Sequence, residues 1–323
     1  MIGGQAAETK TRYDRLVILA FVPLDRYVVR MSENTRTNSI LIVGGGTSGW
    51  LCAAYMANKL GSPETGGPKI TLLESSEIIP IGVGEATIPP IKSAIAATGI
   101  GEAEFLREAQ ATFKMAIRFD HWRKPIGPDS ENHFYHVFGA HGRVGHEPLA
   151  PYWLIDPSAK GKSFVEYSMN NGPIIEAHKG PKRPTDPAFG GPLDYAYHFD
   201  AGLLAKLLKK RALSLGVEHR IDTIEDVALE GEKITSLKTA SGHSLSANLY
   251  VDCTGFHAQL IEKSIKEPFV SAGDVLFCDR AIACPSNFAD ESNDIPPYTK
   301  SIARSKGWIW DVPLQHLNLF IFG

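Results

Sequence analysis

A glycine-rich turn between a predicted strand and a predicted helix constrains the fold of this chain more than any other feature. The apolar, β-branched run Ser39–Val43 predicts a short, buried strand of a parallel sheet. It leads directly into Gly44-Gly-Gly-Thr-Ser-Gly49, and a helix is predicted over Trp50–Leu60. A second strand is predicted over Lys69–Leu73, with Glu74 at its end. The sequence therefore predicts a βαβ unit that carries an acidic residue where its second strand ends.

The spacing Gly44-x-Gly46-x-x-Gly49 in this unit is typical of a dinucleotide-binding fingerprint. Its first glycine permits a tight turn, its second lets the backbone approach a pyrophosphate, and its third lets helix and strand pack closely. The helix N-terminus offers N–H groups to the phosphates, and Glu74 can accept hydrogen bonds from ribose hydroxyls. A glycine-rich turn without a ligand is the alternative. The residues expected to bind the cofactor here are Gly44, Gly46, Thr47, Ser48, Gly49 and Glu74.

A second glycine-rich segment, Gly82-Val-Gly-Glu-Ala-Thr-Ile-Pro-Pro90, follows the fingerprint by one βαβ length. Its glycines permit close backbone approach, and its prolines fix φ and remove two N–H donors. These properties predict a stiff strap that lies against a large flat group, which favours a flavin over a nicotinamide. We expect Gly84, Glu85, Ala86 and Thr87 to contact this cofactor. Glu85 has an alternative reading as a loop carboxylate that caps a neighbouring helix.

The bulk composition excludes several classes of function. The chain has 323 residues, of which 43% are hydrophobic, and a formal net charge of −3, so charge gives no case for binding nucleic acid or an anionic membrane. The four cysteines contain no C-x-x-C pair, so we expect no metal site and no redox pair. Reduced thiols favour a cytoplasmic protein. The apolar run Leu16–Leu24 is too short to span a bilayer, and we expect residues 1–37 to be a disordered extension of a module formed by residues 38–323.

Further elements are predicted around the βαβ unit. A helix is expected over Glu102–Phe113 and a strand over Lys114–Trp122. Residues 123–194 are too long for one loop, and we interpret them as a substrate-covering insertion with short strands. A helix is expected within Tyr195–Leu215, and strands within Val217–Ala247.

A last buried strand is predicted over Leu249–Gly255, where it runs into a turn. Asp252 and Gly255 have the pattern expected where a strand end meets a cofactor, and we expect both to bind it. The tail Leu314–Gly323 is apolar and lacks a closing cap, which indicates either a strand cut short or a shifted reading frame.

The order and spacing of several stretches resemble those of the flavin-dependent tryptophan halogenases. The fingerprint is followed by Trp50, as in that family, and Gly82–Pro89 is similar to the family's strap beside the flavin. Thr112-Phe-Lys114 aligns with the segment that bears the family's catalytic lysine. Asn132–Gly139 resembles its aromatic pocket segment, and Trp308-Ile-Trp310-Asp-Val-Pro313 resembles its W-x-W-x-I-P signature with Val312 in place of Ile. The resemblance covers about residues 38–313.

This resemblance implies an α/β protein: a Rossmann-like FAD-binding fold of the flavoprotein monooxygenase type, with an added substrate-covering region. It also implies an enzyme in which FAD, reduced by a separate flavin reductase, works with O₂ and halide ion to make hypohalous acid. That acid would halogenate an indole or tryptophan-like aromatic small molecule. No nucleic acid, membrane or metal is implied, and a homodimer is one assembly that the resemblance allows.

The resemblance also assigns roles to individual residues. Lys114 would hold or activate the hypohalous acid, since an amine donates strongly and its pKa can be tuned by burial. His136 and Phe138 would line the substrate slot by stacking, together with Pro89. Without the resemblance, Lys114 reads as a surface lysine, and His136 and Phe138 as ordinary core residues. Trp308 and Trp310 are expected near the flavin.

One departure from the family is large. The family's chains continue beyond the equivalent of Gly323, and that part would carry the catalytic glutamate and a helical substrate region. We therefore expect this chain to be a fragment that binds FAD weakly, exposes hydrophobic surface and lacks halogenation activity. Two alternatives stay open at this point: an FAD-dependent aromatic monooxygenase, and a non-catalytic FAD-binding module.

Overall fold

The βαβ unit predicted from the glycine fingerprint is present in the computed structural model, which describes residues 37–77, 84–123, 132–287 and 294–323. Strand β1 (Ser39–Val43) leads into helix α1 (Thr47–Leu60), and β2 (Lys69–Glu74) follows. Both strands are as predicted, and the helix begins three residues earlier than Trp50 because Gly46 is its N-cap. The described residues all fall within one unit, Thr37–Gly323.

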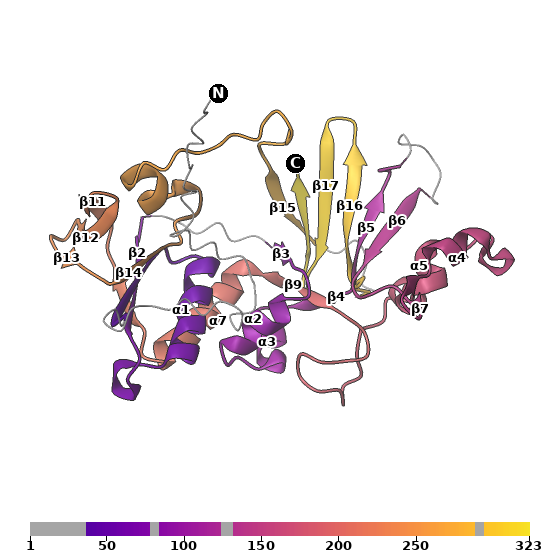
Figure 1. The fold of residues 1–323 in the computed structure, drawn as a ribbon, viewed down its shortest axis with the longest axis horizontal. Helices are drawn as coiled ribbons and strands as arrows, with labels where there is room; N and C mark the ends of the chain where they lie inside the picture. Colours follow the sequence, from indigo (N-terminus) through magenta and orange to yellow (C-terminus); the bar gives the residue numbers. More distant parts are fainter. Residues whose placement is uncertain (1–36, 78–83, 124–131, 288–293) are drawn as a thin grey trace, which may run out of the picture. The chain divides into compact units, whose positions relative to one another are not determined.

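The parallel sheet has the strand order β10-β2-β1-β14. Strands β10 (Glu218–Ile221) and β14 (Leu249–Asp252) were predicted and both are parallel to their neighbours. Alternate residues of β1 point to opposite faces. Ile40 and Ile42 join the large core with α1 and α7 (Ala201–Ser214), whereas Leu41 and Val43 join a smaller core with Ile234 and Leu237. Figure 1 shows α1 and α7 next to each other beside this sheet.

The other face of the parallel sheet is covered by a small antiparallel sheet. Strands β11 (Ile224–Glu230), β12 (Lys233–Thr239) and β13 (Ser244–Leu245) form it within the region where strands were predicted, and their turns fall at Gly231 and Gly242. The parallel sheet therefore has helices on one face and the small antiparallel sheet on the other, in agreement with the α/β fold expected from the sequence.

A three-stranded antiparallel sheet joins segments that are far apart in the sequence. Its order is β3-β9-β4, with β3 at Gly84–Ala86, β9 at Ala196–Asp200 and β4 at Thr112–Lys114. The helix predicted over Glu102–Phe113 is shorter than expected: α3 spans Glu102–Glu108. The chain then turns through Gln110, whose φ of 48° lies in the left-handed region, and enters β4.

The strand predicted over Lys114–Trp122 is in fact two strands, β4 and β5 (Ala116–Asp120). The break occurs at Met115, whose N–H donates to the carbonyl of Pro297 (2.7 Å) instead of continuing the ladder with β9. Strand β5 therefore belongs to a different sheet.

That sheet has six strands in the order β15-β18-β17-β16-β5-β6 (Figure 1). The other members are β15 (Ile282–Ser286), β16 (Tyr298–Arg304), β17 (Gly307–Pro313), β18 (Asn318–Phe322) and β6 (His133–Val137). The apolar tail is well integrated, because β18 is hydrogen-bonded to both β15 and β17 and Leu314 and Leu319 are buried. The structure thus gives the tail residues a regular place in a sheet.

The predicted insertion at 123–194 contains more helix than the sequence suggested. After β6 come the short strands β7 (Arg143–Val144) and β8 (Glu147–Pro148), and then three helices of five or six residues each. These are α4 (Ala150–Ile155), α5 (Phe164–Ser168) and α6 (Asn171–Glu176). Helices this short show no readable periodicity, which is why the sequence did not reveal them.

The remaining short elements are α2 (Ile91–Ala97), the 3₁₀ turns Pro63–Thr65, Pro157–Ala159 and Gly255–His257, and the π-helix Gln259–Ser264. Within the described ranges, no helix is long and apolar enough to cross a membrane.

Candidate active site

The fingerprint turn has the geometry that its three glycines predict. Gly44 has φ +112°, and a Cβ there would overlap the carbonyl of Cys253. A Cβ at Gly49 would overlap the carbonyl oxygen of Gly44, so the helix passes directly over the turn. A Cβ at Gly46 would meet no atom within 4 Å, and no side chain caps the helix there. The turn is thus closed on two sides and open at Gly46, where the helix N-terminus can receive a diphosphate.

Thr47 and Ser48, the other residues of this turn that are predicted to bind the cofactor, differ in their surroundings. The Thr47 hydroxyl donates to the carbonyl of Ala201 (3.1 Å), at the start of α7, so its side chain ties the two helices together. Ser48 is exposed beside the open side of the turn. Its hydroxyl is hydrogen-bonded to the thiol of Cys253, which lies beside the turn.

Glu74 lies over the same turn from the end of β2. Its Oε1 accepts hydrogen bonds from His219 Nε2 (2.7 Å) and Lys209 Nζ (3.0 Å). Its Oε2 lies against Gly45, since a Cβ added there would overlap that oxygen. One oxygen is therefore held by two donors of the protein, while the other is directed toward the fingerprint turn, as a ribose-binding carboxylate requires.

Asp252 has a structural task that the sequence did not reveal. It pairs with Val43 at the same sheet edge, and its carboxylate accepts from the backbone N–H groups of Thr254 (3.0 Å), Leu260 (2.7 Å) and Ile261 (3.0 Å). These bonds hold the turn and the start of the π-helix beside the fingerprint. Gly255, with φ +60°, lies in that turn.

The predicted strap and the predicted lysine segment are both hydrogen-bonded to one strand, β9. Residues 82 and 83 of the strap lie outside the described residues, and its described part begins at Gly84. Ala86 on β3 pairs with His198, which also pairs with Thr112 on β4. Two residues further along β4, Lys114 pairs with Ala196. The strand β9 therefore fixes the spacing between strap and lysine.

Thr87 fastens the strap to this strand. Its hydroxyl donates to the Tyr197 carbonyl (2.8 Å) and accepts from the Tyr197 N–H (3.2 Å). Pro89 and Pro90 then start helix α2, and Pro90 is its N-cap. Glu85 is reached by solvent, yet burial by the surrounding protein raises the pKa of its carboxyl. The hydroxyl of Thr87 is thus used in hydrogen bonds to β9. Among the described residues, the Glu85 carboxyl forms no hydrogen bond that would cap a neighbouring helix.

Lys114 is a deeply buried amine. Only 1% of its surface is exposed, and this burial lowers the pKa of Lys114 to about 8. Its Nζ lies 5.4 Å from the centroid of the Phe138 ring, and the ring of His136 lies 6.2 Å from that of Phe138. Phe138 is buried and His136 is exposed, so a line of two rings leads from solvent to the amine. The reading of Lys114 as a surface lysine is wrong.

Trp308 and Trp310 lie on the same face of β17, with ring centroids 5.2 Å apart. Val312 shares this face and stands opposite Leu319 of β18. A Cβ at Gly84 would come within 3.1 Å of Leu319, so the described start of the strap packs on this face of the six-stranded sheet.

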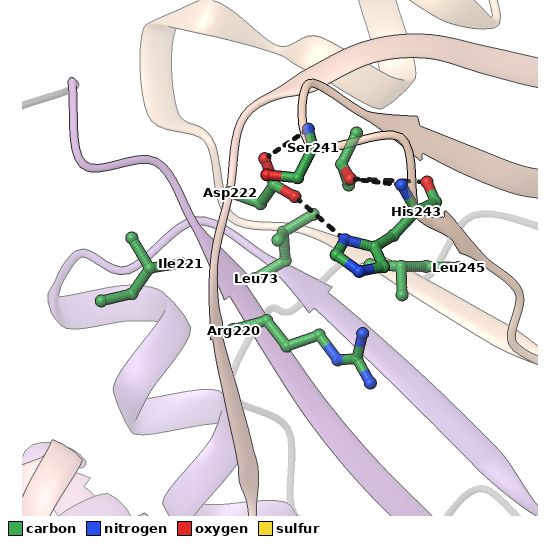
Figure 2. A pocket seen from close by; sticks show the side chains of 8 residues that line it. Leu73, Arg220, Ile221, Asp222, Ser241, His243 and Leu245 are labelled. Carbon is green, nitrogen blue, oxygen red and sulfur yellow. Dashed lines mark hydrogen bonds and ion pairs between the residues drawn. The ribbon is translucent and has the colours of Figure 1, made fainter.

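A separate hollow lies away from the lysine, between β10 and the small antiparallel sheet (Figure 2). Its charged residues are already paired. Asp222 forms an ion pair with His243 (3.6 Å) and accepts the N–H groups of Thr223 (2.9 Å) and Ser241 (3.3 Å). Hydrogen bonds from Thr239 and these backbone groups lower the pKa of Asp222 to about 2. This hollow therefore offers no free polar group that would mark a site.

The candidate site consists of the fingerprint turn, the strap and the buried Lys114. The part of the chain that is similar to known proteins contains all three. Residues 39–319 match the model of a single family, described as tryptophan halogenase. This chain belongs to the tryptophan halogenase family. The predicted resemblance and the predicted Rossmann-like α/β fold are thereby confirmed.

Two curated tryptophan halogenases illustrate the relationship. Tryptophan 7-halogenase RebH from Lentzea aerocolonigenes is 39% identical over 293 residues, which cover 86% of this chain and 54% of the relative. Tryptophan 6-halogenase ThaL from Streptomyces albogriseolus is 37% identical over 300 residues, with 87% and 54% covered. The chain spans about half the length of these halogenases.

A solved tryptophan halogenase from Shewanella frigidimarina superposes with a TM-score of 0.82 at 32% identity. The superposition covers 88% of this chain and 55% of that structure. The flavin-dependent tryptophan C-6 halogenase Tar14 gives a TM-score of 0.80 at 35% identity. The fold described above is thus that of the corresponding half of these halogenases.

Two contacts near the candidate site were not predicted from the sequence. His198 is fully buried on β9 between strap and lysine strand, in a segment where the sequence predicted only a helix. The thiol of Cys253 contacts that of Cys52, and this hydrogen bond lowers the pKa of Cys253. Both contacts join residues far apart in the chain, so no local pattern predicts them. The one signal in the sequence was His198 itself, a polar residue within the otherwise apolar run Tyr195–Phe199.

Proposed function

We propose that this chain forms the FAD-binding and lysine-bearing part of a flavin-dependent halogenase that acts on an indole or tryptophan-like aromatic ring. The observation that carries the proposal is the buried amine of Lys114, placed by β9 at a fixed distance from the strap. A structural lysine at a strand end would be solvated, and its pKa would stay near that of a free lysine.

The residues present fit FAD as the cofactor. The open N-terminus of α1 at Gly46 suits the diphosphate, and the second oxygen of Glu74 suits the adenosine ribose. When bound and reduced by a separate flavin reductase, FAD would supply the oxidising chemistry that turns O₂ and halide ion into hypohalous acid. The strap from Gly84 to Pro89 would separate that chemistry from the aromatic substrate.

Lys114 would receive the hypohalous acid. Because its pKa is about 8, about a tenth of the amine is uncharged at pH 7, compared with less than about a thousandth for a free lysine. The uncharged amine can form an N–halogen bond with hypohalous acid, with loss of water, and the charged form can hold the acid by a hydrogen bond. Phe138 and His136 would then present the aromatic ring to the same nitrogen by stacking.

The wider arrangement is part of the same proposal. Residues 38–323 would form the module, and residues 123–194 would cover the substrate. Of the predicted extension 1–37, residues 1–36 lie outside the described residues. The four cysteines are free, which supports a reducing compartment such as the cytoplasm. Exposed apolar side chains such as Phe269 and Phe277 support association with further polypeptide, including a second copy in a homodimer.

The proposal is tested with purified chain, FAD, a flavin reductase, bromide or chloride, and tryptophan. Flavin fluorescence measures cofactor binding, and mass spectrometry separates halogenated from hydroxylated product. Halogenation that disappears in Lys114→Met and persists in Lys210→Met, an exposed lysine on α7, supports the proposal. A hydroxylated product would favour an aromatic monooxygenase instead. FAD binding without turnover is expected of the chain alone, which spans about half the length of its relatives, and the same result with the other half of a relative supplied would leave a non-catalytic FAD module. No observation on the site or its relatives favours either alternative.

A further inference from the structure

A histidine with no solvent contact lies between the strap and the lysine strand. His198 is 0% exposed, and both of its ring nitrogens are bonded to hydroxyls. Nδ1 lies 3.0 Å from Thr112 Oγ1, and Nε2 lies 2.8 Å from Thr299 Oγ1. Both threonines are themselves buried.

The hydrogen bonds fix the form of this imidazole. The Thr112 hydroxyl donates to the carbonyl of Pro313 (3.0 Å), and a hydroxyl has a single hydrogen to donate. It must therefore accept from the N–H on Nδ1 of His198, which leaves Nε2 to accept from the Thr299 hydroxyl. Burial, together with the nearby positive charge of Lys114, holds the pKa of His198 well below its usual range. The ring is neutral, with its proton on Nδ1.

This imidazole joins two sheets where the lysine strand meets the six-stranded sheet. His198 is on β9 and Thr112 on β4, whereas Thr299 is on β16 and Pro313 ends β17. Thr112 is two residues before Lys114, so their side chains share one face of their sheet. The chain from Pro313 through Thr112 and His198 to Thr299 thus anchors the strand that carries the buried amine.

Most other charged groups on the surrounding elements face away from His198. Glu85 on β3 pairs with Phe199 and lies on the opposite face of the three-stranded sheet. Lys300 on β16 and Asp311 on β17 lie on the opposite face of the six-stranded sheet, where they pair at 3.6 Å. Arg118 on β5 pairs with Lys300 in register and shares that face.

Asp200, two residues after His198 on β9, shares its face, but its carboxylate accepts the N–H of Leu203 at the start of α7 (2.8 Å). His136 on β6 lies on the same face of the six-stranded sheet as Thr299 and is exposed to solvent. Lys114 is thus the buried titratable group that shares the face of His198.

We propose that His198 is a positioning residue for Lys114: its neutral imidazole, donating to Thr112, holds strand β4 against the six-stranded sheet and keeps the amine buried. The role of the amine itself rests on the proposed halogenase function. The positioning depends on the Nδ1 side of the ring, because that side reaches the lysine strand. The Nε2 side anchors the ring to β16.

The two amide replacements of histidine separate these sides. In His198→Asn the amide can occupy the place of Nδ1 and still donate to Thr112. In His198→Gln the longer side chain reaches the place of Nε2 and Thr299, and the donor to Thr112 is lost. Thr112→Val removes the same bond from the lysine strand with little change of shape, and it replaces His198→Gln should that variant fail to fold.

The readout is the pH dependence of amine labelling at Lys114 in the full chain, with acetic anhydride as the probe and peptide mass spectrometry as the detector. We expect a midpoint near pH 8 in the unaltered protein and in His198→Asn. In His198→Gln and Thr112→Val we expect the midpoint to rise by at least about one pH unit, a tenfold loss of labelling at pH 7. Exposed Lys210 serves as the internal reference.

An unchanged Lys114 midpoint in both His198→Gln and Thr112→Val would overturn the proposal, as would equal shifts in the Asn and Gln variants. A purely structural histidine would lower the melting temperature of both amide variants without moving the midpoint. The labelling requires no turnover, so a failure of the halogenase proposal, seen as an active Lys114→Met variant, is recognised separately.

Discussion

The amine of Lys114 and the ring of Phe138 face each other across 5.4 Å, in a region that solvent barely reaches. An aromatic face attracts an ammonium ion weakly, with an energy of about 1–2 kcal/mol. This attraction does not offset the loss of hydration, because the pKa of Lys114 is still lowered to about 8. The site therefore keeps a cation at a cost in stability, which is expected where the amine is needed for chemistry.

Lys114→Met is predicted to stabilise the chain. A buried lysine whose pKa falls from 10.5 to about 8 destabilises the folded state by about 3 kcal/mol at pH 7 relative to a neutral side chain. Between pH 8 and 10.5 the unfolded chain binds the extra proton, so the unaltered protein gains stability as the pH rises. The advantage of Lys114→Met is thus full below pH 8 and vanishes above about pH 10.5.

Urea unfolding of both proteins at pH 7 and pH 10 measures this prediction. Lys210→Met is the matched control, because Lys210 is exposed, and its free energy of unfolding should track that of the unaltered protein at both values. A Lys114→Met variant that is less stable at pH 7 would show that the amine is not buried as described.

Glu102→Gln is predicted to destabilise the chain by about 3–5 kcal/mol. Burial by itself would raise the pKa of Glu102, but Lys182 Nζ (2.7 Å), Tyr195 OH (2.7 Å), Tyr197 OH (2.6 Å) and the Phe189 N–H (2.8 Å) reverse this, and the net pKa is lowered. The amide would leave the nearly buried Lys182 ammonium without its counter-ion.

The sign of the pH effect at Glu102 follows from the same shift. A lowered pKa gives stability that is present above about pH 4.5 and is lost as the pH falls through the folded value. The difference between Glu102→Gln and the unaltered protein should therefore shrink below pH 4.5. Glu108→Gln, an exposed position on the same helix, should change the melting temperature little; a comparable loss there would remove the special role of Glu102.

Local patterns in the sequence were sufficient for part of this fold and for part of the site. The strand Ser39–Val43 and the tight turn at the three fingerprint glycines are encoded by residues next to each other in the sequence, and the structure contains both as predicted. The bond from His198 to Thr112 links residues 86 apart, and the one to Thr299 links residues 101 apart. No periodicity encodes such pairs. The break at Met115 has the same origin, since its N–H is taken by the distant Pro297.

Exposed apolar side chains between residues 256 and 282 predict self-association. Several are more than two-thirds exposed, among them Phe256 (98%), Phe269 (80%), Val270 (83%), Phe277 (83%) and Ile282 (71%). We expect the chain to bind a hydrophobic dye and to associate with increasing concentration in sedimentation velocity. The double variant Phe269→Ser/Phe277→Ser should reduce both signals, whereas Leu154→Ser, also exposed but on α4, should not. Equal effects of the two would contradict a localised surface.

Gly46→Ala and Gly49→Ala are predicted to separate cofactor binding from folding. At Gly49 a methyl group would overlap the carbonyl oxygen of Gly44, and neither backbone can move without breaking the turn. At Gly46 the same methyl group meets no atom within 4 Å, and the φ of −75° is ordinary for alanine. Gly49→Ala should therefore lower the melting temperature strongly, whereas Gly46→Ala should leave it unchanged.

Although Gly46→Ala should leave the melting temperature unchanged, it is the variant expected to weaken FAD binding in a folded protein. A methyl group at Gly46 stands where a diphosphate would approach the helix N-terminus, so Gly46→Ala should raise the Kd for FAD at least about tenfold, a loss of about 1.4 kcal/mol. Quenching of flavin fluorescence measures this on the folded protein. Unchanged FAD binding by Gly46→Ala would mean that the cofactor does not use this turn, and the assignment of Gly44–Gly49 as its phosphate site would be wrong.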